Sequence, residues 1–374
     1  MPENPREANT YSAHIRGDNM LHHFIVTRIG IGIHNENWYR GALGLFEAIT
    51  FPSLCAQTCP DFTCLLIVDR NIPESAKSRL DAIVGGHKNF HLVPIDLTAM
   101  QQVHQGCFDY IWDRCQNYLL AHRTIVDPFE YIITSVLDAD DAWHVETLDL
   151  VQKRMTEEMP AFLASERRNM TWTRHTGGAC LAFANGLRWY AHPDVVMPLH
   201  RLFGDMFVFV AARFSSGISA CSSRHTQWAS YCNVVDFKDI KCQRATPMWV
   251  YVRHDRSEVG WDVKDNESDS ESVRQLHADF GIDFDKVQSW REDHELRAIG
   301  RGDNIPRSHD GMAGTEQLDC YFRISALNRQ IAILECDAGN AGADGSLDRL
   351  LASQRRARDE LVRRFHDQAQ SHFR

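Results

Sequence analysis

Three carboxylates follow directly on an apolar stretch in the sequence YIITSVLDADDAW, residues 131–143. The apolar part predicts a buried β-strand, and Asp138, Asp140 and Asp141 come immediately after it. On an extended backbone Asp138 and Asp140 point to the same side. Two carboxylates this close repel each other unless a cation joins them, and Mn2+ or Mg2+ takes oxygen ligands while leaving positions open for phosphate oxygens. The pattern indicates a metal site for a diphosphate; the alternative is a solvated turn, in which Asp is also favoured.

Other polar residues end further apolar stretches. Thr27 and Arg28 end the first stretch, Asp69 ends DFTCLLIVD, and His254 ends MWVYVRH. Ligands of parallel α/β sheets bind beyond the carboxyl ends of the strands. A guanidinium binds phosphate through two parallel hydrogen bonds, and imidazole is a suitable ligand for Mn2+. For each of these residues the alternative is a surface polar group that follows a strand.

The elements that must position these residues alternate regularly along the first 145 residues. Strands are predicted at residues 22–33, 61–69, 90–95 and 131–137. Helices are predicted within residues 38–59, 73–84 and 107–126, with Pro52 as a break or kink in the first of them. This order predicts an α/β fold, with a mostly parallel sheet flanked by helices and right-handed crossovers.

The second part of the chain has a different pattern. Strands are predicted at residues 160–167, 180–186 and 246–254, with a helix within 192–207. A polar, acidic surface connection is expected over residues 256–285, and a helical tail within 346–368. The predicted divisions are a polar leader (1–20), an α/β half (21–145), a second half of the same domain (146–262), and the acidic connection with the C-terminal helical region (263–374).

Charge and hydropathy exclude several classes of protein. The chain has 50 acidic and 40 basic residues and a formal charge of −10, so general binding to nucleic acid is not expected. The N-terminal residues lack the apolar core of a signal peptide, and no apolar run approaches the ~18 residues of a membrane span. A cytoplasmic protein is predicted. Arginines beside a leucine stripe in the C-terminal helix allow peripheral contact with an anionic membrane; packing of that helix on its own domain is the alternative.

Several motifs together resemble a known family. They are TRIGIG, then LFE-x4-PSL-x2-Q within residues 45–57, the strand ending in VD, and SVLDADDA. These residues resemble the GT-A glycosyltransferases and, more narrowly, the bacterial family called putative rhamnosyltransferases. The resemblance covers roughly the first 145 residues, with a weaker similarity in SSRHTQW and MWVYVRH.

The resemblance implies a GT-A-like, Rossmann-like fold and transfer of a sugar, rhamnose by the family label, from a nucleoside diphosphate sugar to a glycan or lipid-linked glycan acceptor, in surface polysaccharide synthesis. It implies that residues 21–145 are the nucleotide-sugar-binding half and residues 146–262 the acceptor-binding half. It implies that Asp140 binds Mn2+ or Mg2+ directly and that Asp138 contacts the metal or the sugar nucleotide. Asp69 matches the position that faces the nucleobase, and Thr27 and Arg28 match the loop around the nucleotide. A His such as His254 is often recruited as a further metal ligand in similar enzymes.

The acceptor site and the catalytic base are less well marked. The segment RHTQW makes His225 and Trp228 candidates for acceptor binding, since an aromatic face stacks on a sugar ring while polar groups bind its hydroxyls; a helix start with a core Trp is the alternative. The candidates for the base are Glu166, Asp205 and Asp236. The signature Trp-Gly-x-Glu-Asp of many inverting enzymes is absent, so inversion and retention both stay open.

Two other functions fit the same carboxylates. One is metal-dependent phosphoryl or nucleotidyl transfer, although the chain lacks the phosphate-binding motif G-x4-G-K-[ST]. The other is a non-catalytic carbohydrate-binding protein that has kept a transferase fold.

Overall fold

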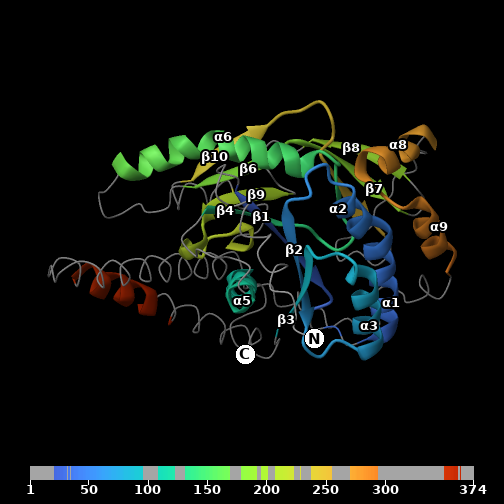
Figure 1. Cartoon of the computed structure of the whole chain (residues 1–374), viewed down its shortest axis with the longest axis horizontal. Helices are drawn as coiled ribbons and strands as arrows, with labels where there is room; N and C mark the ends of the chain where they lie inside the picture. Colours follow the sequence, from blue (N-terminus) through green and yellow to red (C-terminus); the bar gives the residue numbers. More distant parts are fainter. Residues whose placement is uncertain are drawn as a thin grey trace, which may run out of the picture.

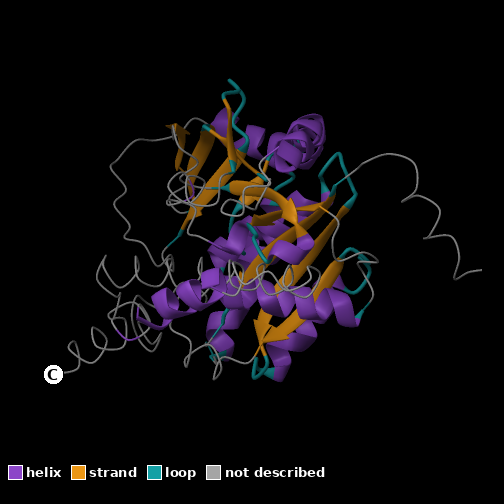
Figure 2. Cartoon of the chain, turned by 90° about the vertical axis from the view of Figure 1, so that its left-hand side faces the viewer, coloured by secondary structure: helices purple, strands orange, loops and turns teal. Residues whose placement is uncertain are grey.

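Two β-sheets form the framework of the protein. The structure, a computed structural model, describes residues 21–31, 33, 35–95, 108–122, 131–168, 178–191, 195–200, 207–222, 228, 237–254, 270–293, 349–360 and 363. Within these residues a seven-stranded sheet has the order β10-β6-β9-β4-β1-β2-β3, and a four-stranded sheet has the order β5-β11-β7-β8. Figures 1 and 2 show helices around the strands of the larger sheet, as expected for an α/β fold.

The predicted parallel strands form one half of the larger sheet. The strand β1 (His22–Ile29) pairs in parallel with β2 (Phe62–Asp69) and with β4 (Tyr131–Val136), and β2 pairs in parallel with β3 (Phe90–Ile95). The carboxyl ends of parallel strands meet at one edge of a sheet. Asp69 and the acids that follow β4 therefore lie at the same edge.

Helices cover both faces of this half-sheet. The helices α1 (Glu36–Leu45), α3 (Glu74–Val84) and the N-terminal part of α6 (Thr147–Arg168) share a hydrophobic core with one face. On the other face lies α5 (Phe108–Ala121), whose Trp112 is fully buried. In Figure 1, α1 and α3 lie beyond β2 and β3, and α6 runs across the sheet. The strands are therefore buried on both faces, which explains their nearly continuous apolar sequences.

The predicted break at Pro52 is a change of helix type. The helix α1 continues into a π-helical turn, η2 (Phe46–Thr50), and then into α2 (Phe51–Cys55), with Pro52 in the first turn of α2. Proline has no amide hydrogen and its ring collides with the preceding turn of an α-helix. The wider π turn before Pro52 accommodates the ring without ending the helical run.

The other half of the larger sheet is mixed. The strand β9 (Val208–Arg213) runs antiparallel to both β4 and β6 (Ala179–Phe183), and β10 (Lys238–Cys242) pairs in parallel with β6. Two short 3-10 turns, η3 (Phe214–Ser216) and η4 (Ala220–Ser222), follow β9. The order of β9 between β4 and β6 brings the second part of the chain against the predicted nucleotide-binding half.

The four-stranded sheet lies beside the carboxyl end of β4. Its strands are β5 (Ala142–Trp143), β11 (Trp249–Arg253), β7 (Asn185–Tyr190) and β8 (Val195–His200). The helices α8 (Ser270–Phe280) and α9 (Phe284–Glu292) share a second core with this sheet and with η2. Since β5 comes directly after the acids of residues 138–141, the acidic segment connects the two sheets.

Three predicted elements are corrected. Residues 160–167, predicted as a strand, lie in α6, whose Leu148, Val151 and Met155 recur at helical spacing and are fully buried. Residues 192–207, predicted as a helix, contain β8, because pairing with β7 selects the extended form of VVMPLH. The expected acidic connection contains α8 and the start of α9, whose Leu276 and Val287 are buried.

The C-terminal helical prediction is confirmed over residues 349–360, the red helix in Figure 1. Most of its described arginines are exposed, whereas Leu351 is buried. None of the helices among the described residues is both long enough and apolar enough to cross a membrane.

A close contact between two strands of the smaller sheet gives the first prediction. A Cβ atom on Gly186 would lie 2.1–2.3 Å from three ring atoms of the fully buried Trp249. We expect Gly186→Ala to lower the free energy of unfolding by about 1–3 kcal/mol, because the indole must move in a packed core. Urea denaturation measures this. Gly86→Ala is the matched control, since nothing lies within 4 Å of its added methyl group; equal effects of the two substitutions would contradict the packing argument.

A buried histidine gives a prediction about pH. His23 is fully buried in β1, its Nε2 lies 2.9 Å from Ser135 Oγ, and burial lowers its pKa to about 3. The unfolded chain binds a proton at this position below its ordinary pKa of about 6.5, whereas the folded chain does not do so until about pH 3. Stability is therefore lost as the pH falls through this window, by about 2 kcal/mol between pH 7 and pH 5.

We expect the free energy of unfolding of His23→Gln to decrease less between pH 7 and pH 5 than that of the wild type. Urea denaturation at a series of pH values measures how the free energy of unfolding changes with pH. Destabilisation that the substitution causes equally at every pH does not affect this change. His122→Gln, at an exposed position, is the control and should keep the wild-type slope. An unchanged slope in His23→Gln would show that His23 does not titrate as described.

Candidate functional site

The acidic segment at the end of β4 divides its side chains between two environments. Asp138 and Asp140 are partly exposed, whereas Asp141 is 1% exposed. A turn closes the segment, with the amide of Asp141 donating to the carbonyl of Asp138 over 3.2 Å. A turn, and not the extended backbone expected from the sequence, therefore separates the partly exposed Asp138 and Asp140 from the buried Asp141.

Asp138 is paired with an arginine from the neighbouring strand. Nη2 of Arg28 lies 3.1 Å from Oδ1 of Asp138, and the two side chains are 34% and 43% exposed. The parallel pairing of β1 with β4 sets both residues at the same edge of the sheet. Because the pair is open to solvent, it contributes little to stability, and its arginine is accessible to a ligand.

Asp140 is paired with the histidine that follows β11. Nε2 of His254 lies 2.8 Å from Oδ2 of Asp140, and the His254 side chain is 7% exposed. The ring of Trp290 in α9 lies edge-on to the imidazole, with the ring centroids 6.0 Å apart. The structure therefore brings together Asp140 and His254, which are 114 residues apart in the sequence.

Asp141 fixes the acidic segment to the second sheet. Its Oδ1 accepts a hydrogen bond from the amide of Val252 in β11, with a donor–acceptor distance of 2.8 Å. Burial raises the pKa of Asp141 well above its ordinary value, and the negative charges of Asp140 and Asp138 raise it further. Both effects favour the neutral carboxylic acid, whereas the hydrogen bond from the Val252 amide lowers the pKa. Through this hydrogen bond Asp141 connects the acidic segment to β11 of the second sheet.

Tyr251 and Arg253 in β11 border the same segment. The guanidinium carbon of Arg253 lies 4.2 Å from the centroid of the Tyr251 ring. Burial raises the pKa of Tyr251 to about 12, with contributions from Asp141, Asp138 and Asp140, whereas Arg253 lowers it. Arg28 of the larger sheet and Arg253 of the smaller sheet carry two positive charges, which equal in number the negative charges of Asp138 and Asp140.

The site fits a divalent cation only if a substrate or water supplies further ligands. Among the described residues, no three His, Cys, Asp or Glu side chains converge closely enough to hold a metal ion by themselves. Asp140 and His254 form a contacting oxygen–nitrogen pair of the kind that Mn2+ accepts, and Asp138 is partly exposed beside them. Mn2+ and Mg2+ commonly take their remaining ligands from substrate phosphates and water, so the residues present fit such an ion in a site completed by a substrate.

The other residues predicted for nucleotide binding are buried. Thr27 is fully buried beside the Cys64 thiol, so in this structure its side chain lies within the sheet and not in a loop that encloses a ligand. Asp69 is also fully buried, and its Oδ1 accepts a hydrogen bond of 2.8 Å from the amide of Asn71. Asp69 therefore orders the turn after β2; its contact with a nucleobase stays a prediction.

The residues predicted for acceptor binding and base catalysis are mostly outside the described residues. His225, Asp205 and Asp236 lie there. Glu166 belongs to α6, but its side chain is outside the described part. Trp228 is 1% exposed, and its indole nitrogen donates to the carbonyl of Ala220 over 3.4 Å. The Trp228 ring is a core residue in this structure, which corrects its predicted role in stacking on an acceptor sugar.

The sequence did not indicate the contact that orders the loop after β1, at the edge of the sheet where the acids lie. Tyr39 donates from its hydroxyl to the carbonyl of Gly30 over 2.7 Å and thereby orders the loop after β1. Gly30 has a positive φ of 59°, and an added Cβ would lie 2.6 Å from atoms of Trp38 and Tyr39. The glycines of TRIGIG were a usable signal for this close contact.

A hollow of about 550 Å3 lies at the other end of the larger sheet. Its lining comes from the C-terminal end of α3, the start of β3 and Tyr118 of α5. None of the acids of residues 138–141 lines it. It is therefore separate from the site at the carboxyl ends of the strands.

The parallel half-sheet, the antiparallel β9 and the flanking helices form the mostly parallel α/β fold that the sequence predicts, and the match to a family of glycosyltransferases identifies the class of protein. The family described as putative rhamnosyl transferase matches residues 31–259, which is more than half of the chain. The chain belongs to this family. No curated protein matches the chain.

Solved structures of TarS from S. aureus overlap the chain only weakly. Residues 1–349 of TarS in complex with UDP are 10% identical to it, cover 94% of this chain and 92% of the TarS chain, and give a TM-score of 0.33. The same TarS residues without UDP give the same identity and coverage with a TM-score of 0.30. At these scores the overlap supports no conclusion about the site.

The contact between Asp141 and β11 gives a prediction about stability. We expect Asp141→Ala to lower the free energy of unfolding by about 1–3 kcal/mol, because it leaves the buried amide of Val252 without its acceptor. Asp141→Asn keeps an oxygen at that position and should lose less, since the native side chain is favoured in its neutral form. Urea denaturation at pH 7 measures both. Equal losses in the two variants would show that the hydrogen bond is unimportant.

Proposed function

We propose that the chain is a metal-dependent glycosyltransferase that uses a nucleoside diphosphate sugar as donor. The observation that carries this proposal is the contact between Asp140 and His254 at the carboxyl edge of the sheet, beside the partly exposed Asp138. Asp140 lies in the turn after β4, His254 directly follows β11, and the two meet where ligands of such folds bind. Membership of the family supports sugar transfer over the phosphoryl-transfer and carbohydrate-binding alternatives.

The proposed division of roles follows from the charges. Asp140 and His254 would hold Mn2+ or Mg2+, and Asp138 would contact the metal or the sugar nucleotide. When bound, the cation would stabilise the negative charge of the departing diphosphate. Arg28 can exchange its exposed carboxylate partner for a phosphate, to which a guanidinium donates two parallel hydrogen bonds. With the charges of the two aspartates balanced by Arg28 and Arg253, the cation and the donor diphosphate would balance each other.

Rhamnose is the sugar that the description of the family suggests. We infer a glycan or lipid-linked glycan as acceptor, as in the synthesis of surface polysaccharides. A lipid-linked acceptor lies at a membrane surface, and the exposed Arg355 and Arg356 of the C-terminal helix would favour peripheral contact with anionic lipids. We infer that one of Glu166, Asp205 and Asp236 is the base that deprotonates the acceptor hydroxyl.

Nucleotide binding tests the proposal. UDP, dTDP and GDP are titrated calorimetrically into the full chain with Mn2+ and, separately, with EDTA. We expect one of them to bind only with the metal, and Asp140→Ala to weaken that binding at least about tenfold, equivalent to about 1.4 kcal/mol. His254→Ala should weaken it in the same direction.

Asp149→Ala is the matched control for the titration, because it removes a partly exposed aspartate that lies outside the acidic segment and forms an ion pair with Lys153 on α6. It should bind the nucleotide as the wild type does. Binding that ignores both EDTA and Asp140→Ala would eliminate the metal site. If none of the three nucleotides bound, a donor of this class would be excluded.

A further inference from the structure

A row of three buried polar side chains, two in the helical run η2–α2 and one two residues after its end, faces the acidic segment and the residues that follow it. The residues are Thr50, Ser53 and Gln57, and their exposed fractions are 0%, 0% and 7%. Their spacing of three and four residues places them on one side of a helix. Ser53 and Gln57 belong to the motif LFE-x4-PSL-x2-Q, whose role the metal and the diphosphate do not explain.

Thr50 contacts the turn that carries the acids. Its hydroxyl donates to the carbonyl of Asp141 over 2.9 Å and lies 3.4 Å from the carbonyl of Asp138. These are the first and last residues of the turn that is closed by the Asp141 amide. The Thr50 hydroxyl therefore holds both ends of the turn, with the partly exposed side chains of Asp138 and Asp140 between them.

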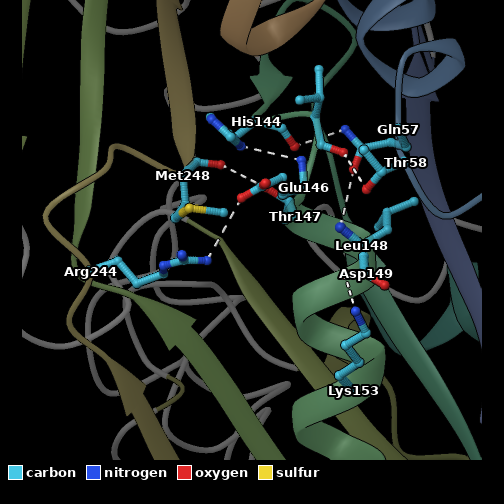
Figure 3. Close-up of polar contacts among 11 residues, drawn as sticks. Gln57, Thr58, His144, Glu146, Thr147, Leu148, Asp149, Lys153, Arg244 and Met248 are labelled. Atoms are coloured by element: carbon cyan, nitrogen blue, oxygen red, sulfur yellow. Dashed lines mark hydrogen bonds and ion pairs between the residues drawn. The ribbon is translucent and has the colours of Figure 1, made fainter.

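Ser53 and Gln57 hold the chain that leaves the turn. Oγ of Ser53 donates to the carbonyl of Trp143 over 2.9 Å and accepts from its amide over 3.0 Å. Nε2 of Gln57 donates to the carbonyl of His144 over 3.0 Å, and its Oε1 accepts from the amide of Leu148 over 3.1 Å. Figure 3 shows Gln57 between the segment at His144 and the start of α6 at Leu148. The side chains of the row thus provide hydrogen-bond partners for backbone groups that lack β-sheet partners.

The helical run is itself held firmly. Glu47 in η2 forms ion pairs with Arg79 of α3 over 3.1 Å and with Lys286 of α9 over 3.0 Å. Neighbouring residues of η2 belong to both hydrophobic cores, with Phe46 in one and Ile49 in the other. A π-helical turn, which often occurs at functional sites, ends at Thr50.

We propose that Thr50 is a positioning residue that sets the distance and orientation of Asp138 and Asp140 for the metal and the diphosphate. Metal and phosphate sites tolerate displacements of only about 0.5 Å, and their ligands are held by surrounding hydrogen bonds. Asp140 has no regular β-pairing of its own, so the turn depends on Thr50 at its ends and on the Asp141–Val252 contact. This inference rests on the proposed function, because it assigns Thr50 to the same site.

The test compares substitutions that remove the threonine hydroxyl with one that keeps it. Thr50→Val removes the hydroxyl and keeps the shape, Thr50→Ser restores the hydroxyl, and Thr58→Val makes the same change at the exposed Thr58, whose hydroxyl donates to Val145 over 3.2 Å. The ligand is Mn2+ with whichever of UDP, dTDP and GDP binds the wild type best. Calorimetry is done well below the melting temperature of every variant.

We expect Thr50→Val to weaken metal-dependent nucleotide binding about tenfold, and Thr50→Ser and Thr58→Val to stay within about twofold of the wild type. A purely structural Thr50 would lower the melting temperature and leave this affinity unchanged, which would overturn the inference. If Thr50→Val does not fold, Thr50→Ala is compared with Thr58→Ala in the same way.

The outcomes separate the two proposals. If the wild type binds the nucleotide with metal and Thr50→Val binds it equally well, only the positioning role fails. If Thr50→Ser is as weak as Thr50→Val, the hydroxyl is not the determining group and the positioning role also fails. If the wild type binds none of the nucleotides, the proposed function fails and the positioning role fails with it.

Discussion

Mutual repulsion among three carboxylates within four residues is the constraint on which the arrangement of this protein depends. Left together at the end of one strand, the charges of Asp138, Asp140 and Asp141 would destabilise the fold. Each acid instead has a separate solution: the guanidinium of Arg28 for Asp138, the imidazole of His254 after β11 for Asp140, and the backbone amide of Val252 for Asp141, whose pKa is raised by burial. Two of the three solutions require β11, so the second sheet is part of the site.

The helical run α1–η2–α2 connects the two hydrophobic cores beneath this site. Leu43 and Phe46 belong to the core of the larger sheet, whereas Leu45 and Ile49 belong to the core shared with α8 and α9. Trp290 of α9 reaches this run, donating from its indole nitrogen to the carbonyl of Gly41 over 3.2 Å, and it also borders His254. Residues well beyond the strands therefore support the side chains at the carboxyl edge.

The sequence predicted the first half of the fold because its signals are local and agree with one another. Apolar runs of strand length alternate with helical periodicity up to Trp143, and the strands of this half form as predicted. It also placed Asp138, Asp140 and His254 among the site residues, since each ends an apolar strand. Their pairings could not be predicted, because Arg28 and His254 reach the acids through a strand order that no local pattern encodes.

The errors in the second half have the same origin. Residues 195–200 are compatible with helix or strand, and tertiary pairing with β7 decides the outcome. The segment of residues 160–167 alone has the length of a strand. Its place in a helix becomes evident only with Leu148, Val151 and Met155, which belong to the same helix and recur at helical spacing. Trp228 stands beside polar residues in the sequence, but its burial depends on neighbours from distant elements, and the same holds for Thr27 in the first half.

The separation of Asp140 from His254 also has a consequence for synthesis of the chain. The two residues are 114 positions apart, so at ribosomal rates the aspartates emerge about 6–23 s before the imidazole that contacts one of them. During that interval the strand β4 can pair with β1, and Arg28 can already neutralise Asp138, because both strands have been made. Asp140 and Asp141 must wait for β11. The site is therefore one of the last parts of the described fold that a nascent chain can complete.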